Sequence, residues 1–592
     1  LSNTTASNNT AVGYQAGYSN TTGDYLTAVG WQALFSNTTG VQNVAMGRYA
    51  LGSNTTGGYN VALGNQALIS NTTASSNTAV GYQAGYSNTT GSPITVVGYQ
   101  AGYSNTSGEI QAFGRLASYS NTTGVANSSF GLSALYANTT GGYNTALGYN
   151  ALVSNTTANS NTAVGYEAAY SNTTGSPTTA FGKQALKANT TGTNNCAFGQ
   201  GTLQTNITGT TNSAFGTLAL RDNTGSNNSS VGYASLLTNT SGADNVAMGV
   251  SSLRVNTTGG QNTALGTAAL TANTTASNNT AVGYRAGYSN TTGTATTAIG
   301  YQAVMDNTTS VQTTAVGFQA AKRTTAANNT AVGCVALRDN TTGTENAAFG
   351  KYALVQATTG SYNTALGSDA LYSNTTASNN TAVGYQALYT NTTSISNAAF
   401  GNKALHLATG TLNTALGNGA GRDLSSGAKN TIIGAYGGNE NGLDIRTASN
   451  HIVLSDGDGN PRMHIDNSGY VKAIGIYNYT TGSSANVHVL SNGYLQRSTS
   501  SLRYKNTVND ATHGLTELMT LRPVTYKGNN DGDTVFGGLI AEEVHAAGLA
   551  EFVMYNDDNE PDALAYSNMV SLCIKAIQEQ QATITALTDR IT

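Results

Sequence analysis

Apolar and polar residues follow one another in a fixed order that recurs along most of the chain. Residues 10–17 read Thr-Ala-Val-Gly-Tyr-Gln-Ala-Gly, and close copies continue to residue 434. An apolar residue precedes the first glycine of each copy, and in most copies an alanine follows that glycine three residues later. Alternation over a few residues is typical of a strand, and the apolar spacing does not follow the 3.6-residue period of a helix. The pattern therefore predicts a strand, a corner, a second short strand and a polar turn in each copy.

The glycine at the centre of each copy marks the period of the repeat. It falls at Gly13, Gly30 and Gly47 and recurs to Gly434, in steps of 17 residues that shorten to 16 at four places. One copy cannot bury its apolar residues alone, but a stack of coils can. The corners are expected at Gly and Asn, which tolerate left-handed backbone. With about 4.8 Å per stacked strand, 25 steps predict a rod of roughly 120 Å.

The period ends after residue 435, and two further regions follow. Residues 436–499 contain short alternating stretches around Gly- and Asp-rich turns, which predicts a β-rich transition region. From residue 500 charge rises and glycine becomes rarer, which indicates a small α+β domain with a short helix within residues 538–549.

The last segment, residues 569–592, has apolar residues at a seven-residue spacing. This spacing predicts a C-terminal coiled-coil helix, and isoleucine at the first seam is compatible with three strands. An amphipathic helix that packs on its own domain is the alternative. The first seam is Val570, Ile577, Ile584 and Ile591, and the second is Cys573, Gln580 and Leu587.

Composition excludes several classes of function. Charged residues make up 9% of the chain and the net charge is −4 without a basic block, so nucleic-acid binding is not expected. Membrane insertion is not expected either, because no run of 18 apolar residues occurs. Low charge with abundant Asn, Thr and Gly is also found in disordered chains, but the strict phase of the hydrophobic residues argues against disorder.

Neither a cofactor nor a metal is expected. The three cysteines are far apart and suggest no disulfide framework and no CxxC metal site. The stretch Ser-Asp-Gly-Asp-Gly-Asn at residues 455–460 looks like a calcium loop, but it lacks the glutamate that an EF-hand has at its twelfth position.

Two recurring residue types allow two interpretations each. Asn-x-Thr sequons, as at Asn20 and Asn37, are either glycosylation sites of a secreted rod or turn residues that bond the local backbone. We favour turn chemistry, because the repeat requires these residues without any glycan. The tyrosines after the glycine, such as Tyr14 and Tyr82, either stack on sugars or form a structural ladder, and we favour the ladder.

The repeat resembles the left-handed parallel β-roll in the heads of YadA-like trimeric adhesins, in which Asn-x-Ala-x-Gly-x-x-Ala recurs. The resemblance covers residues 1–435, and the coil here is longer by a few residues in its Asn-Thr-Thr-Gly turn. Similar repeats occur in phage tail-fibre-like proteins. The resemblance implies a mostly β fold, a left-handed parallel β-roll or solenoid of 17-residue coils, and a trimer.

The C-terminal region resembles a second family. Ser-Ser-Leu-Arg-Tyr-Lys at 500–505, Leu-Arg-Pro-Val-Thr-Tyr-Lys-Gly at 521–528 and Gly-Leu-Ile-Ala-Glu-Glu-Val at 538–544 resemble the self-cleaving intramolecular chaperone of endosialidases, phage tailspikes and tail fibres. A related module occurs in myelin regulatory factor. The resemblance covers residues 499–592.

This second resemblance implies self-cleavage of the Thr499–Ser500 bond by a Ser500–Lys505 dyad, with Arg503 in a supporting role. Ser501 stands where the family often has Asp. A serine hydroxyl needs a base, and lysine serves as one only when desolvation or nearby positive charge lowers the pKa of its amine. Residues five apart do not share a helix face, so a turn, a strand or another subunit must complete the site.

Together these features predict a homotrimeric fibre, viral or phage tail fibre-like, that attaches to a host surface. Residues 1–435 would be the shaft, 436–499 the transition and 500–592 a chaperone and autoprotease that aligns three chains, because identical columns can mis-pair by one coil. We expect an extracellular or virion location, a host receptor that can be a glycan, and no enzymatic activity beyond autoproteolysis. A cell-surface adhesin or extracellular filament subunit is the alternative. A glycosidase tailspike is disfavoured, because Asp and Glu are sparse in the repeats.

Overall fold

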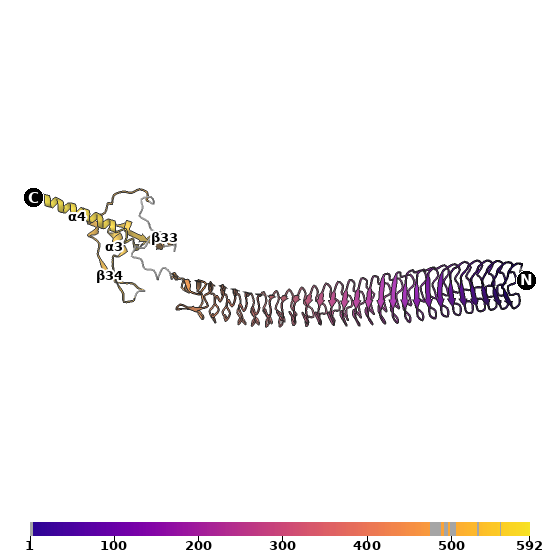
Figure 1. The fold of residues 1–592 in the computed structure, drawn as a ribbon. Helices are drawn as coiled ribbons and strands as arrows, with labels where there is room; N and C mark the ends of the chain where they lie inside the picture. Colours follow the sequence, from indigo (N-terminus) through magenta and orange to yellow (C-terminus); the bar gives the residue numbers. More distant parts are fainter. Residues whose placement is uncertain (1–3, 474–486, 490–494, 498–504, 530–531, 557) are drawn as a thin grey trace. The chain divides into compact units, whose positions relative to one another are not determined.

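The computed structural model describes residues 4–473, 487–489, 495–497, 505–529, 532–556 and 558–592. The chain divides into two compact units, residues 1–477 and residues 478–592. The first unit is a β-solenoid, in which coils stack on one another from the indigo N-terminal end to the orange end (Figure 1). The predicted stack of 17-residue coils is confirmed.

Each coil of the solenoid contributes one strand of three or four residues to a parallel sheet. Ala28 pairs with Ala45, and Ala45 pairs with Ala62, so each strand is in register with the strand one coil further on. The sequence pattern indicates two strands per coil, whereas the described coils contain one, because the rest of the coil turns repeatedly. The strands are β1 (Thr10–Val12), β2 (Thr27–Val29), β3 (Val44–Met46), β4 (Val61–Leu63), β5 (Thr78–Val80), β6 (Thr95–Val97), β7 (Ile110–Phe113), β8 (Asn127–Phe130), β9 (Thr145–Leu147), β10 (Thr162–Val164), β11 (Thr178–Phe181), β12 (Asn195–Phe198), β13 (Ser213–Phe215), β14 (Ser229–Val231), β15 (Val246–Met248), β16 (Thr263–Leu265), β17 (Thr280–Val282), β18 (Thr297–Ile299), β19 (Thr314–Val316), β20 (Thr330–Val332), β21 (Ala347–Phe349), β22 (Thr364–Leu366), β23 (Thr381–Val383), β24 (Ala398–Phe400), β25 (Thr414–Leu416) and β26 (Thr431–Ile433).

The repeating glycine is called the marker glycine, and coil positions are counted from it. In the second coil Gly30 is position 0, Val29 is position −1 and Gln32 is position +2. The backbone at Gly30 has φ 131°, and a Cβ atom there would lie 2.6 Å from the carbonyl oxygen of Gly47. Only glycine fits this position, because a side chain would collide with the backbone of the next coil.

The turns of each coil use left-handed backbone at residues other than glycine. In the second coil Gln32, Leu34 and Gln42 have φ of 52°, 51° and 56°, and most other coils repeat these values at the same positions. Gly and Asn therefore supply only part of the predicted corners. Backbone hydrogen bonds to neighbouring coils oppose the cost of this conformation, since the N–H of Leu34 donates to the carbonyl of Ala50 at 3.0 Å.

The core of the solenoid is a set of small and medium apolar columns. In the second coil Ala28, Ala33 and Leu34 are fully or almost fully buried, and the same three positions are buried in most coils. Because the coil is narrow, its interior holds alanine at two of the three positions. The buried columns run along the rod and form its hydrophobic core.

The C-terminal end of the solenoid is closed by irregular strands and one tyrosine. Strand β29 (Ile452–Ser455) pairs in parallel with β26 and antiparallel with β30 (Pro461–Ile465), which pairs with β31 (Val471–Ala473). A hairpin of β27 (Asn439–Glu440) and β28 (Leu443–Asp444) lies between β26 and β29 in the chain. Tyr436 is fully buried under this hairpin, and its hydroxyl donates to the carbonyl of Leu443 at 2.8 Å.

The described part of the second unit contains three hairpins, several short helices and one helix of 22 residues. Its core comprises buried side chains of α3 (Ala541–Ala546), η2 (Ala550–Phe552), β36 (Val553–Tyr555) and α4 (Val570–Ile591), including Val544, Phe552 and Leu572. The predicted helices are confirmed as α3 and α4. The elements are β32 (Val487–Val489), β33 (Leu495–Arg497), α2 (Leu515–Leu518), β34 (Val524–Lys527), β35 (Val535–Gly538), α3 (Ala541–Ala546), the 3-10 helix η2 (Ala550–Phe552), β36 (Val553–Tyr555), β37 (Pro561–Leu564) and α4 (Val570–Ile591).

Candidate functional site

The outward surface of the sheet is uncharged and carries an apolar column along its length. This surface, here called the strand face, consists of the residues at positions −1 and −3 of every coil. Position −1 is apolar in all coils from Val12 to Ile433, and in none of them is it buried. Val12 is 57% exposed and Leu416 is 52% exposed. None of β1–β26 contains a charged residue. The strand face thus carries a continuous apolar column at position −1, beside a column at position −3 that is mostly threonine. A long exposed apolar column is of the kind that marks interaction sites.

A second surface, here called the corner face, consists of positions +1, +2 and +5 of every coil. It carries columns of aromatic and amide side chains. Tyr86, Tyr103, Tyr119 and Tyr136 form one continuous stack with ring centroids 4.9 to 5.1 Å apart. Burial in this stack and the neighbouring phenols raise the pKa of Tyr103. This stack lies at position +5. The tyrosines directly after the marker glycine, for which the ladder is predicted, also stack, since the ring centroids of Tyr82 and Tyr99 are 5.3 Å apart.

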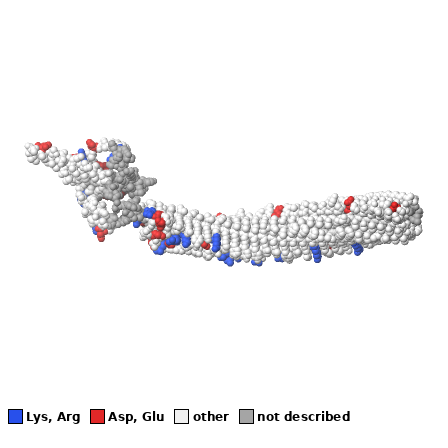
Figure 2. Space-filling model, viewed as in Figure 1, with Lys and Arg blue, Asp and Glu red and all other residues white. Residues whose placement is uncertain are grey.

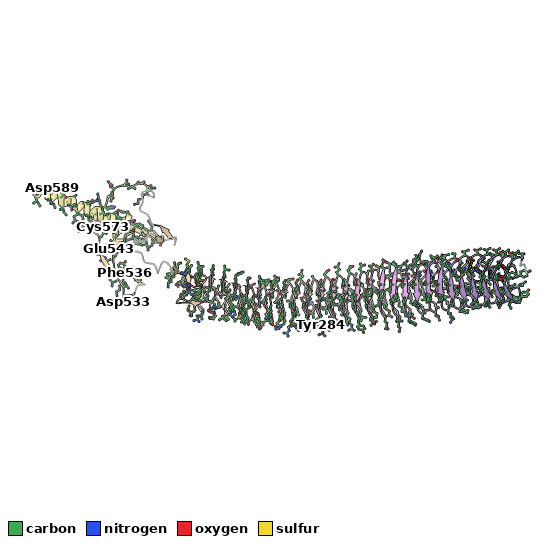
Figure 3. All side chains as sticks on the ribbon, in the orientation of Figure 1. Tyr284, Asp533, Phe536, Glu543, Cys573 and Asp589 are labelled. Carbon is green, nitrogen blue, oxygen red and sulfur yellow. The ribbon has the colours of Figure 1, made fainter. Side chains whose placement is uncertain are left out.

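Contacts between the columns join them into one face. The guanidinium of Arg285 at position +2 lies over the rings of Tyr284 and Tyr288, 5.3 and 5.1 Å from their centroids. Lys187 at position +5 pairs at 2.7 Å with Glu167 at position +2 of the preceding coil. Hydrogen bonds from Lys187 and from a neighbouring glutamine lower the pKa of Glu167. In Figure 3, Tyr284 lies on the same edge of the rod as most Lys and Arg in Figure 2.

The sequon asparagines at position +7 form a buried ladder. Asn37 is fully buried, and its Nδ2 donates to Asn20 Oδ1 at 2.9 Å and to the carbonyl of Gly40 at 3.0 Å. This nitrogen is the atom to which a glycan would be attached. Turn chemistry therefore accounts for these sequons. A different sequon, at Asn278, lies at position +12 and is exposed.

The ladder is interrupted where the repeat lacks asparagine. Position +7 is Ala357 in one coil, between Asn340 and Asn374 in the neighbouring coils. Asn340 Oδ1 is consequently buried without a hydrogen-bond partner. A buried polar atom in this state destabilises the fold locally.

Two histidines meet where the solenoid ends. His451 Nδ1 and His464 Nε2 are 2.8 Å apart, and burial lowers the pKa of both side chains. Asp466 opposes this shift at both, whereas the charge of Lys472 adds to it at His464. The pair is thus held neutral more firmly than an exposed histidine.

The calcium-like loop uses its first carboxylate within its own turn. Asp456 Oδ1 accepts the backbone N–H of Asn460 at 2.8 Å and of Asp458 at 3.1 Å. Hydrogen bonds from Asn460 and an ion pair with Arg462 hold the pKa of Asp456 well below its usual range. Among the described residues, no group of three or more His, Cys, Asp or Glu is placed to hold a metal ion.

Helix α4 has one buried face near its start and an exposed apolar seam along its length. Leu572 and Ala576 are buried, whereas Ile577 is 63% exposed and Ile591 is 86% exposed. The start of the seam borders an apolar groove of about 650 Å³. The groove is lined by Leu518, Leu521, Pro523, Leu539, Tyr566, Met569, Val570, Cys573, Ile574 and Ile577.

Most of the predicted cleavage site lies outside the described residues. Thr499, Ser500 and Arg503 all fall there, so the predicted dyad stays a prediction. Lys505 is described and exposed, at the start of the segment 505–529. In the part of the chain that the structure describes, every helix is too short or too polar to cross a bilayer.

Comparisons of the chain with protein-family models, curated proteins and solved structures give no match. The fold defines the chain as a β-solenoid repeat protein, and its function is inferred from the strand face, the corner face and the C-terminal unit.

Proposed function

We propose that the chain is the subunit of a homotrimeric fibre that attaches to a host surface, outside the cell or on a virion. The strand face carries this proposal, because it presents an uncharged apolar column along the whole solenoid. A second solenoid with the same coil rise matches such a column coil by coil. We take the coils to wind in the left-handed sense of the β-rolls that the repeat resembles.

The exposed seam of α4 supports the proposal that three chains associate. Isoleucine at Ile577, Ile584 and Ile591 repeats every seven residues on the exposed side of the helix. Isoleucine in this pattern is compatible with three-stranded coiled coils. A trimer of α4 would also bring the three shafts into register, which the near-identical coils cannot do by themselves.

In this proposal residues 500–592 are an intramolecular chaperone that cuts itself from the fibre. Ser500 Oγ attacks the carbonyl carbon of Thr499, the Lys505 amine takes the hydroxyl proton and passes it to the released amine of Ser500, and water hydrolyses the resulting ester. Arg503 supports the site by its charge. The cut follows assembly. After it the shaft has lost the domain that aligned its chains, and it stays assembled because its unfolding is slow.

A denaturing gel tests the cleavage. Wild type gives fragments of 499 and 93 residues, whereas Ser500→Ala and Lys505→Ala each give one chain of 592 residues. Ser501→Ala is the matched control, because the adjacent serine is not the nucleophile and this variant is cut normally. Wild-type protein that still runs as one chain of 592 residues after native assembly would contradict the proposed self-cleavage.

Sedimentation of the native protein tests the trimer, with three chains per particle expected and one chain per particle contradicting it. The cell-surface adhesin or filament subunit predicts the same trimer. Electron microscopy of the particles that carry the protein separates the two functions.

A further inference from the structure

We propose that the corner face binds an anionic polysaccharide that lies along the rod. This inference rests on the proposed function, because it gives the chemical class of the host receptor. Every Lys and Arg from residue 10 to residue 434 lies on the corner face, except Arg323 and Lys429. These cations are scattered in the sequence, but the repeat places them on three of its 17 positions. Figure 2 shows most of them along one edge of the rod.

Negative charge lies mainly elsewhere. Only Glu167 and Asp369 share the corner face, and the other acidic residues up to residue 434 lie at position +6 or in the polar turn at positions +11 and +12. Ion pairs hold Lys187, and they hold the three arginines that directly precede an aspartate at position +6. The remaining cations of this face make no ion pair with a described residue, so no described carboxylate neutralises their charges.

The unpaired cations recur at regular distances along the rod. Arg48, Arg115, Lys183 and Arg254 follow one another at intervals of four coils, and the next three unpaired cations of the face follow at intervals of two coils. With about 4.8 Å per coil these intervals are about 19 Å and about 10 Å. One coil is about as long as one sugar residue of an extended polysaccharide, so a regular polymer can meet equivalent groups repeatedly.

The uncharged groups of the corner face fit a carbohydrate better than a nucleic acid. Tyr284, Tyr301 and Phe318 stack with centroids 5.4 and 5.2 Å apart, so the ring of Tyr301 has both faces covered. Nucleic-acid bases need free aromatic faces for stacking. The exposed parts are ring edges, phenol hydroxyls and amides such as that of Gln319, which suit the hydroxyl groups and apolar edges of sugars.

Binding of defined polymers to the full-length protein tests the inference. The probes are heparin for sulfate groups, polygalacturonate for carboxylate groups, dextran as a neutral polymer and double-stranded DNA as a different polyanion. Titration calorimetry is expected to detect heparin, polygalacturonate or both, and no dextran. Which of the two binds identifies the anionic group. Equal binding of dextran, or tighter binding of DNA than of either polysaccharide, would overturn the inference.

A matched pair of variants places the binding on the corner face. Arg115→Gln with Lys183→Gln removes two charges from it, and Gln200 shows that the repeat accepts glutamine at position +1. Arg323→Gln with Lys429→Gln removes two charges from elsewhere on the rod. The first pair is expected to weaken binding about fivefold and the second to leave it unchanged. Equal losses for the two pairs would overturn the inference, provided that both melt like wild type.

The inference and the proposed function fail separately. A cleaved trimer that binds neither charged polysaccharide contradicts this inference and leaves the fibre standing. A single uncleaved chain that binds heparin through the corner face contradicts the fibre and leaves the polysaccharide site standing.

Discussion

Replacing Ala357 by asparagine is expected to stabilise the solenoid by completing its buried ladder. Ala357 is fully buried at position +7, and Asn340 in the coil before it has an Oδ1 without a partner. In an intact part of the ladder, Asn54 Nδ2 donates to Asn37 Oδ1 at 2.8 Å and to the carbonyl of Gly57 at 2.9 Å. An asparagine at residue 357 would supply the same two bonds.

The size of the gain follows from these bonds. A buried acceptor without a partner costs about 1–3 kcal/mol, and a further hydrogen bond contributes about 1 kcal/mol. Ordering the new side chain opposes this by about 1 kcal/mol. The free energy of local opening around residues 340–374 should therefore rise by about 2 kcal/mol, which slows amide hydrogen exchange there about 30-fold.

Hydrogen exchange followed by mass spectrometry measures this change, and Ala408→Asn provides the control. Ala408 also lies at position +7, but Asn391 Oδ1 in the preceding coil already accepts the N–H of Ser394 at 3.1 Å, and the next coil has Leu424 at this position. No comparable gain is expected at Ala408. Exchange in the Ala357→Asn variant that is as fast as in wild type, or an equal gain at Ala408, would refute the reasoning.

Two further predictions concern the histidine pair and the sequons. Burial lowers the pKa of His451 and His464, so the unfolded chain binds protons more readily, and stability is present above about pH 6.5 and falls as the pH decreases. The urea concentration at the unfolding midpoint of wild type should be lower at pH 5 than at pH 7.5, and His464→Gln should make this difference smaller. An equal difference in the variant would contradict the role of the histidine pair. An oligosaccharyltransferase acting on the folded protein should modify exposed Asn278 and spare buried Asn54, whereas it should modify both residues in the unfolded chain. A glycan found by mass spectrometry on Asn54 of the folded protein would contradict the buried ladder.

The sequence was sufficient to predict the solenoid because its strongest signals are strictly periodic. The marker glycine and Ala33 recur with the coil, and both positions are constrained by close packing against neighbouring coils. The outward direction of position −1 was not predicted, although the strand Thr-Ala-Val contained the signal. Side chains alternate across a strand, so a buried Ala28 requires that Val29 face outward.

Other features had weaker signals or none. Leucine gives no indication that Leu34 adopts left-handed backbone, because hydrogen bonding between stacked coils imposes that conformation. The cations of the corner face form no block in the sequence, and only their position within the 17-residue period reveals them. The dyad of Ser500 and Lys505 depends on a resemblance, and its serine lies outside the described residues.

The shortened coils have a consequence for how the length of the rod can change during evolution. Thr95 pairs with Gln111, 16 residues on, as regularly as Thr27 pairs with Val44, so the polar turn absorbs a missing residue while the sheet continues. Residues 9–23 and 77–91 are identical, and recombination between their coding segments would excise four coils and join two compatible ends. The rod would become about 19 Å shorter, with every remaining coil still seated on a neighbour that fits it.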